Sequence, residues 1–273
     1  MSRLRGVAKL LALVVANAVF FGVIVVSSVG LVWLARFGRT GRGDPAWRTG
    51  VFHAWGKTMA RLLGMRVTTG GNHPRPPFVL VSNHLGYVDV VLLASELRCV
   101  FVSKAEVRDW PVVGRLCSSV DTLFIRREQK REIPRVMTEM ERVLASGRGI
   151  VLFPEGTSSP GDDVLRFRPS LLESAARTGR PVHYACLAYR TPAGSPAARD
   201  AVCWWGKMPF VSHVFGLLSL PGFEARIEFG DQPIVERERK ALTQRLQREV
   251  ERQFRTVIWV RSAERDRARK ENR

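Results

Sequence analysis

The chain has 273 residues, and this length allows one large α/β domain with additional elements. Its 43 Lys and Arg residues outnumber 25 Asp and Glu residues, which gives a formal net charge of +18 and indicates an anionic partner: nucleic acid, a membrane surface or an anionic substrate. An arginine-rich genome would produce part of the same excess. The four cysteines are widely spaced without a Cys-x-x-Cys pair, which argues against a metal site and predicts reduced, buried thiols in a cytosolic body.

The longest apolar run covers residues 10–34 and is interrupted only by one Asn and two Ser. It exceeds the ~20 residues that a helix needs to span a bilayer, and it is too long for the apolar part of a signal peptide. We therefore predict a membrane helix within an N-terminal anchor at residues 1–45. The denser positive charge after the run favours a cytoplasmic body. A hairpin or re-entrant segment lying in one leaflet is the open alternative.

Residues 47–65 carry large apolar side chains at helical spacing, with Arg48, Lys57 and Arg61 between them. A basic amphipathic helix of this kind can lie at a membrane interface. It can equally be an ordinary helix packed on the domain. The sequence leaves both interpretations open.

From residue 66 onward, short apolar runs alternate with helical patterns, which predicts an α/β fold with a mixed sheet flanked by helices. The final stretch, residues 236–273, is dense in Arg and Glu and reads as a solvated basic helix with a frayed tail. The predicted strands are residues 78–81, 100–103, 122–125, 150–153, 181–188 and 225–229, and the predicted helices are residues 88–97, 129–146, 171–178 and 237–254.

A histidine and an aspartate follow the first of these strands at close spacing. His84 leaves the strand directly after Asn83, Asp89 comes five positions later, and Gly86 between them permits a sharp turn. An imidazole held by a carboxylate is the minimal apparatus for taking a proton from a hydroxyl. If His84 and Asp89 face one another, they form an active site.

A second polar turn follows the strand at residues 150–153. Glu155, Gly156 and Thr157 supply a carboxylate, a backbone able to approach a ligand closely, and a hydroxyl. Ligand sites in α/β sheets gather at the carboxyl edge, where such a turn is delivered. A turn of this composition is common in loops. Its occurrence 71 residues after the His84 motif makes the combination of the two motifs a specific signal.

In these blocks the chain resembles the membrane glycerolipid acyltransferases, whose best-known members are the 1-acylglycerol-3-phosphate acyltransferases. The resemblance covers residues 50–235 in order and includes a segment with Lys104, Pro111 and Gly114. The four signature blocks of the family match at Asn83, His84 and Asp89, at Phe124, Ile125 and Arg127, at Phe153 to Thr157 with Ser159, and at Pro181-Val182. Residues 46–235 would then form the acyltransferase domain.

The resemblance implies transfer of a fatty acyl group from acyl-CoA or acyl-carrier protein to the free hydroxyl of a lysophospholipid. The first candidate acceptor is 1-acylglycerol-3-phosphate, which would give phosphatidic acid. His84 would act as general base and Asp89 would fix its tautomer in a direct transfer without an acyl-enzyme. Asn83, Arg127, Glu155, Gly156 and Thr157 would bind substrate. No metal and no cofactor beyond the acyl donor is implied, and the site would face the cytoplasm.

Two positions depart from the family pattern. Asp121 replaces the glycine that opens the second block, and Ser158 stands where phosphate-selecting members often carry an arginine. An arginine there would clamp phosphate through two hydrogen bonds. Its absence opens an alternative acceptor without phosphate, such as a lyso-ornithine lipid.

A reading from another class is a basic membrane-binding protein without catalysis. We exclude nucleic acid as a partner, because the sequence has no recognition-helix signature, zinc-finger spacing or aromatic RNA-binding motif. The aromatic segment at residues 203–210 either borders the acyl chain, dips into the bilayer or belongs to the core. His53, His73, His183 and His213 lie outside the matching blocks and are expected to be structural or exposed.

Overall fold

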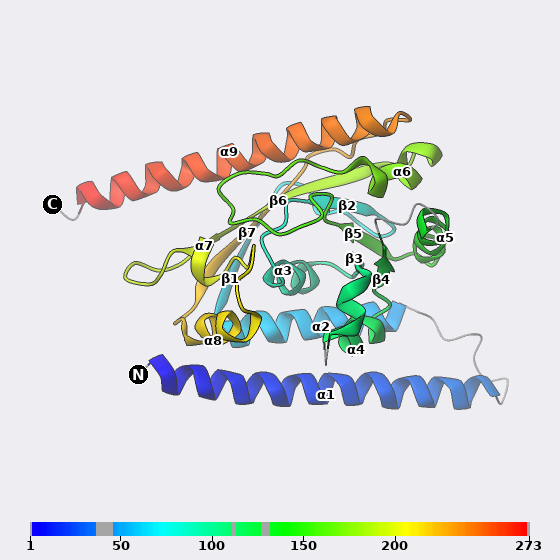
Figure 1. Cartoon of the computed structure of the whole chain (residues 1–273), viewed down its shortest axis with the longest axis horizontal. Helices are drawn as coiled ribbons and strands as arrows, with labels where there is room; N and C mark the ends of the chain where they lie inside the picture. Colours follow the sequence, from blue (N-terminus) through cyan, green and yellow to red (C-terminus); the bar gives the residue numbers. More distant parts are fainter. Residues whose placement is uncertain (1, 37–45, 111–112, 127–131, 272–273) are drawn as a thin grey trace.

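The computed structural model describes residues 2–36, 46–110, 113–126 and 132–271. In this part of the chain, seven strands form one sheet in the order β1-β7-β6-β2-β5-β3-β4, with helices on both faces (Figure 1). Strands β6, β2, β5, β3 and β4 run parallel to one another, while β7 is antiparallel to β6 and parallel to β1. The predicted mixed α/β sheet is therefore confirmed. The strands are β1 (Met65–Gly70), β2 (Val79–Ser82), β3 (Cys99–Lys104), β4 (Leu123–Ile125), β5 (Gly149–Leu152), β6 (Val182–Arg190) and β7 (Phe223–Phe229).

Each of the six predicted strands lies within two residues of an observed one. The sequence missed β1, which is an edge strand with the sequence Met-Arg-Val-Thr-Thr-Gly and exposed or half-buried side chains after Met65. An edge strand pairs on one side only and needs little apolar surface, so its hydrophobic pattern is weak.

Helices α2 (Ala46–Leu63) and α3 (Val88–Glu96) cover one face of the sheet. They approach closely at Gly56, where a Cβ atom would lie 2.6 Å from the carbonyl carbon of Ala94. Phe52, Met59 and Leu63 are buried in the core of this face. Of the two interpretations of this segment, the structure supports the packed helix.

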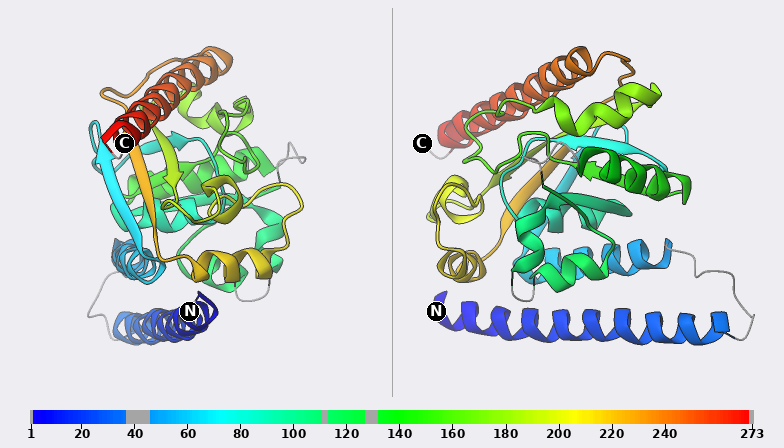
Figure 2. Two further views of the ribbon diagram at one scale, coloured as in Figure 1. Left: turned by 90° about the vertical axis from the view of Figure 1, so that its left-hand side faces the viewer. Right: turned by 45° about the vertical axis from the view of Figure 1, so that its right-hand side comes forward.

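Helix α1 (Ser2–Arg36) lies along the body against α2 and α8 (Phe210–Ser219), and both views of Figure 2 show the same arrangement. The Lys9 ammonium donates to the carbonyl oxygens of Leu63 and Leu220 at 3.1 and 2.9 Å. Trp55 donates from Nε1 to the Asn17 carboxamide oxygen at 3.1 Å. Lys9 and Asn17 of α1 thus serve its contact with the body.

The outer side of α1 is apolar and exposed. Residues 4–24 form a segment long and apolar enough to cross a membrane, and only 11% of its most apolar window is buried. Side chains such as Leu11, Val15 and Val19 are each more than 60% exposed. The membrane-helix prediction is consistent with this composition, although the apolar segment begins six residues earlier than expected.

The opposite face of the sheet is covered by α5 (Glu132–Ala145), α6 (Glu173–Thr178), the short 3-10 helix η2 (Pro169–Leu172) and α9 (Arg239–Glu271). Leu242, Leu246, Val250 and Phe254 of α9 are buried against the sheet. The sequence interpretation of this segment as a solvated helix is therefore corrected, because one side of α9 belongs to the core. The remaining helices are η1 (Ala105–Asp109), α4 (Val113–Ser119) and α7 (Ala198–Ala201).

Candidate functional site

The two polar turns predicted from the sequence meet because β2 and β5 are neighbours in the sheet. Val79, Leu80 and Val81 pair in parallel with Ile150, Val151 and Leu152, a constant offset of 71 residues. Glu155 follows His84 by the same offset, so the register brings both to the same position at the carboxyl edge. The spacing in the sequence is thus a consequence of strand pairing.

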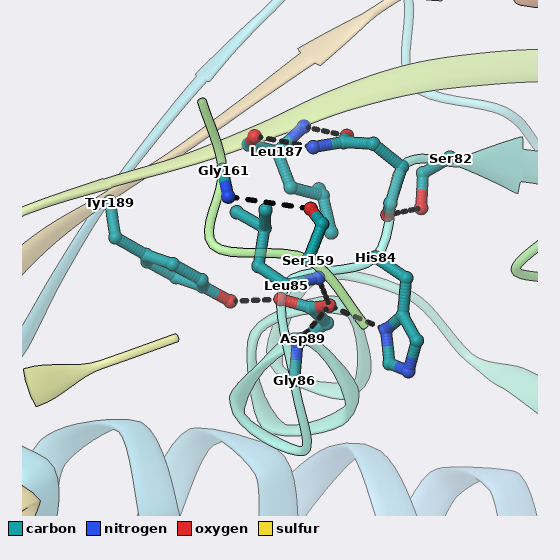
Figure 3. A network of polar contacts seen from close by, with 10 residues as sticks. Ser82, His84, Leu85, Gly86, Asp89, Ser159, Gly161, Leu187 and Tyr189 are labelled. Carbon is teal, nitrogen blue, oxygen red and sulfur yellow. Dashed lines mark hydrogen bonds and ion pairs between the residues drawn. The ribbon is translucent and has the colours of Figure 1, made fainter. Parts of the chain in front are cut away.

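His84 and Asp89 face one another, as Figure 3 shows. The Nδ1 atom of His84 lies 2.7 Å from Oδ2 of Asp89. Gly86 makes the turn between them with φ of +151°, and a Cβ there would lie 2.8 Å from the backbone nitrogen of Trp204. Glycine therefore allows both the turn and the close approach of residue 204.

The carboxylate of Asp89 is fully buried and has four hydrogen bonds. Its Oδ2 atom also accepts from the backbone N–H groups of Leu85 and Gly86, at 2.6 and 3.0 Å. Its Oδ1 atom accepts from the Tyr189 hydroxyl at 2.7 Å. These four donors replace the water that the carboxylate loses on burial. Since this carboxylate accepts from His84, Nδ1 carries the proton and Nε2 is the free, basic nitrogen.

Tyr189 was not anticipated from the sequence. It lies on β6, 100 residues from Asp89, and only the strand order β6-β2-β5 brings it to the site. Burial, together with the Asp89 charge, raises the pKa of the Tyr189 hydroxyl well above its ordinary value. It therefore remains a donor to Asp89.

Asn83 is fully buried and joins β2 to β6. Its carboxamide nitrogen donates to the Leu187 carbonyl at 3.0 Å, and its carboxamide oxygen accepts from the Leu187 N–H at 2.7 Å. Both polar atoms of the side chain thus extend the sheet pairing by one residue. These contacts fix the start of the histidine loop, residues 83–89, and substrate contact by Asn83 stays a prediction.

The imidazole of His84 stacks on the ring of Phe153, with centroids 4.1 Å apart and an interplanar angle of 20°. Phe153 stacks in turn on Phe101. The His84 side chain is 22% exposed, while Asp89 is not exposed at all. The ring is held on one face and at Nδ1, and its partial exposure allows a substrate to reach it.

Glu155 is a second buried carboxyl group, 2% exposed, in the turn after β5. Its Oε1 atom accepts from the Leu165 N–H at 3.2 Å, while Oε2 has no hydrogen-bond partner in the described residues. Burial raises the pKa of Glu155 to about 9, against the lowering effect of the Leu165 and His84 N–H groups and with a further rise from the Asp89 charge. The group is therefore a neutral acid near pH 7.

The rest of this turn is built around Gly156, whose φ of +76° suits glycine. Thr157 is exposed at the surface and Ser158 is half-buried. The Ser159 N–H donates to the His84 carbonyl at 2.9 Å, which ties the turn to the histidine loop. Glu155 thus lies near His84, Gly156 after it is buried, and Thr157 is exposed.

Arg127 lies outside the described residues. Its neighbour Arg126 follows β4 and is exposed. Asp121 occupies the glycine position with φ of +60°, a left-handed conformation that Asp tolerates better than most residues. Its carboxylate accepts from Arg48 at 2.7 Å and from Arg148 at 2.8 Å. These two ion pairs hold the start of the second block.

His53, His73 and His183 contact parts of the protein other than the histidine loop. His53 lies 2.8 Å from the Ala94 carbonyl, His73 packs on Phe229, and His183 packs on Phe78. No disulfide joins the four cysteines, all of which lie in the described residues: Cys99, Cys186 and Cys203 are buried and Cys117 is half-buried.

A profile of the acyltransferase family, described as "Acyltransferase", matches residues 64–187. The chain is 35% identical over 189 residues to a lyso-ornithine lipid O-acyltransferase of Rhizobium meliloti, which covers 65% of this chain and 64% of that protein. It is 31% identical over 217 residues to the protein of the same name from Brucella abortus, covering 75% of this chain and 81% of that protein.

A 1-acyl-sn-glycerol-3-phosphate acyltransferase of Neisseria gonorrhoeae is 29% identical over 176 residues, 62% of this chain and 69% of that protein. The crystal structure of the 1-acyl-sn-glycerophosphate acyltransferase of Thermotoga maritima matches with a TM-score of 0.56 at 22% identity, covering 91% of this chain and 97% of that one. This structural likeness supports the fold. The Brucella relative, together with the family profile, shows that the chain belongs to the acyltransferase family.

Proposed function

We propose that this protein transfers a fatty acyl group from a thioester donor to the free hydroxyl of a membrane lysolipid. The observation that carries the proposal is the His84–Asp89 pair, joined at 2.7 Å beside the buried acid Glu155. An alcohol is a poor nucleophile at neutral pH, so the reaction needs a base within hydrogen-bond reach of the attacking hydroxyl.

In the proposed reaction, Nε2 of His84 takes the proton of the acceptor hydroxyl as its oxygen attacks the thioester carbonyl. The new ester bond forms, the carbon–sulfur bond breaks, and the imidazolium returns the proton to the departing thiolate. Asp89 keeps Nδ1 protonated and stabilises the imidazolium. Tyr189 and two backbone N–H groups hold Asp89 in place.

A direct transfer without an acyl-enzyme fits the described side chains near His84. The Ser82 hydroxyl donates to the Asn83 carbonyl, and the Ser159 hydroxyl accepts from the Gly161 N–H. Burial raises the pKa of Cys203 to about 12, which leaves almost no thiolate at neutral pH. None of these groups is arranged as a nucleophile activated by His84.

Glu155 is proposed to act as a neutral hydrogen-bond donor to the substrate. Its Oε2 atom is buried and without a partner in the described residues, and a buried polar group of this kind is costly unless a ligand completes it. Donation to the oxygen that gains charge during attack would lower the barrier. Gly156 beside it gives the backbone room to approach the substrate.

Two acceptors are proposed. A lyso-ornithine lipid is the first, supported by the names of the Rhizobium and Brucella relatives and by Ser158 in place of a phosphate-binding arginine. The second is 1-acylglycerol-3-phosphate, supported by the name of the Neisseria relative and by Arg126 and Arg127 after the second block. Acyl-CoA and acyl-carrier protein are both anionic donors that suit the net charge of +18.

We infer a membrane location with the site on the cytoplasmic face. The exposed apolar side of α1 supports contact with lipid. Because the other side of α1 packs on α2 and α8, the arrangement favours a helix lying in one leaflet over a span that leaves the body.

The proposal is tested with purified full-length protein, both donor types and a panel of lysolipids with and without phosphate. Saturable transfer to lyso-ornithine lipid alone would support the first acceptor, and transfer to 1-acylglycerol-3-phosphate alone would support the second. Absence of transfer to every lysolipid with either donor would reject the proposed function. His84→Ala serves as the control that any transfer depends on this site.

A further inference from the structure

Helix α8 carries an apolar face that is open to the surroundings. Val211 is 80% exposed and Phe215, one turn later, is 38% exposed. The whole helix, Phe-Val-Ser-His-Val-Phe-Gly-Leu-Leu-Ser, contains no Lys, Arg, Asp or Glu. A surface helix facing water ordinarily carries charged residues on its outer side, whereas the exposed positions of α8 are Val211, Ser212, Phe215 and Gly216. Ten residues are too few to span a bilayer, so any contact of this helix with a membrane would be at the membrane surface.

The apolar face of α8 continues into that of α1. A Cβ built on Gly6 of α1 would lie 3.5 Å from the ring of Phe215, so the two helices touch there. Leu4 and Val7, within one turn of Gly6, are 80% and 46% exposed. Figures 1 and 2 show α8 beside the N-terminal half of α1 from three directions. The exposed apolar residues of both helices therefore belong to one surface.

The start of α8 has the composition of a membrane interface. Trp110 is 36% exposed and packs edge-on against Trp204 and Phe210, with ring centroids 6.0 and 5.9 Å apart. The exposed Lys207 precedes the helix by three residues. Tryptophan and lysine gather where apolar chains meet lipid head groups.

The inner side of α8 holds the histidine loop. His213 donates from Nε2 to the Cys203 carbonyl at 2.9 Å, so its Nδ1 atom accepts from the Tyr87 hydroxyl, also at 2.9 Å. Tyr87 lies between His84 and Asp89 in the chain. The helix thus has an exposed apolar side and a side bonded to the loop that carries the proposed base.

We propose that α8 is a second lipid-contacting helix, which rests in the surface of an anionic bilayer beside α1 and holds the histidine loop against that surface. The inference builds on the proposed function, since a base for a lipid hydroxyl must meet a substrate that leaves the bilayer. Val211 and Phe215 enter the acyl region, Trp110 and Lys207 lie at head-group depth, and His213 with Tyr87 connects the helix to His84.

A bilayer fits this face better than a second copy of the chain. The net charge of +18 attracts anionic lipid and repels an identical molecule. The face is also continuous with the segment at residues 4–24, whose length and hydropathy suit lipid contact.

The test places an environment-sensitive fluorophore on single introduced cysteines in the full chain, with Cys117→Ser removing the half-buried native thiol. Val211→Cys probes α8, and Val15→Cys on the exposed side of α1 reports whether the protein has bound. Val235→Cys is the matched control: it is 48% exposed, lies beyond β7 and belongs to neither helix. Circular dichroism checks that each labelled variant folds.

On addition of vesicles of phosphatidylcholine and phosphatidylglycerol, the label at position 211 should brighten severalfold and shift to shorter wavelength. Nitroxide on the lipid acyl chains should quench it, whereas the label at position 235 should change little. A response at position 15 without one at position 211 would overturn the proposal and leave the proposed function standing. If the fluorescence of the label at position 211 changes with protein concentration in the absence of vesicles, the face binds a second copy of the chain. That result would also overturn the proposal.

Discussion

The site contains two buried carboxyl groups, Asp89 and Glu155, which differ in their hydrogen-bond partners. Asp89, after β2, accepts four hydrogen bonds, from His84, Tyr189 and two backbone N–H groups. Glu155, after β5, accepts one from Leu165 and leaves Oε2 without a partner in the described residues.

The two groups are both buried, so burial alone does not explain how they differ. The number of hydrogen-bond donors around each carboxyl group does. Four N–H and O–H donors replace the water that Asp89 lost on burial. Glu155 has fewer donors, and burial raises its pKa to about 9. The fold therefore supplies two different carboxyl groups. Asp89 orients the base His84, and Glu155 is a neutral acid that can donate a hydrogen bond.

The largest expected effect comes from removing the base or the anion that orients it. His84→Ala and Asp89→Asn should each lower acyl transfer by about 10³–10⁴-fold, because general-base catalysis and the correct tautomer are lost. Initial rates with lysolipid and donor measure this, and vesicle binding should stay unchanged. Activity within a few-fold of wild type for either variant would remove the pair from the mechanism.

The second prediction compares amide substitutions at the two carboxyl groups, which tests whether each acts as a neutral acid or as an anion. Glu155→Gln keeps a neutral donor and should retain activity within a few-fold, whereas Glu155→Ala should lose about 10²-fold. The corresponding amide at Asp89 should be far more damaging, which makes Asp89→Asn the matched comparison. Equal losses for Glu155→Gln and Asp89→Asn would mean that Glu155 acts as an anion.

The pH dependence follows from the same assignment. The folded-state pKa of Glu155 lies above its ordinary value of 4.5, so the proton is kept until the pH rises through about 9. Wild-type transfer should fall through that range, after subtraction of donor hydrolysis without protein, and Glu155→Gln should lack this decline. The free energy of unfolding of wild type should also decrease relative to Glu155→Gln between pH 4.5 and 9, because the unfolded carboxyl ionises first.

A smaller effect is expected for Tyr189→Phe. The variant removes one of the four hydrogen bonds to Asp89, worth about 1 kcal/mol, and should slow transfer by about fivefold. Rates near pH 7 for wild type and Tyr189→Phe measure it. A loss as large as that of Asp89→Asn would mean that Tyr189 contacts the reacting groups itself.

The chain pattern predicted most of the sheet and the meeting of His84 with Asp89, since both follow from local features. Apolar runs marked the strands, Gly86 marked the turn, and the five-residue spacing brought the two side chains together. The relation of His84 to Glu155 needed the family resemblance, because only the β2–β5 register explains the spacing.

The partners of Asp89 and Asn83 could not be predicted. Tyr189 and Leu187 lie on β6, and nothing in a single sequence states that β6 is placed next to β2. The neutral state of Glu155 could not be predicted either, since it depends on how few hydrogen-bond donors the fold brings to its carboxyl group. The covered side of α9 was missed because Arg and Glu dominate its composition, although its buried residues recur at helical spacing.

The most direct measurement follows release of the donor thiol by purified protein with and without lysolipid, and checks the protein by intact mass. We expect thiol release only when a lysolipid with a free hydroxyl is present, with one ester formed for each thiol released. No acyl group should remain on the protein, and His84→Ala should release no thiol. Thiol release without acceptor that leaves one acyl group on the protein, or undiminished transfer by His84→Ala, would contradict the proposed mechanism.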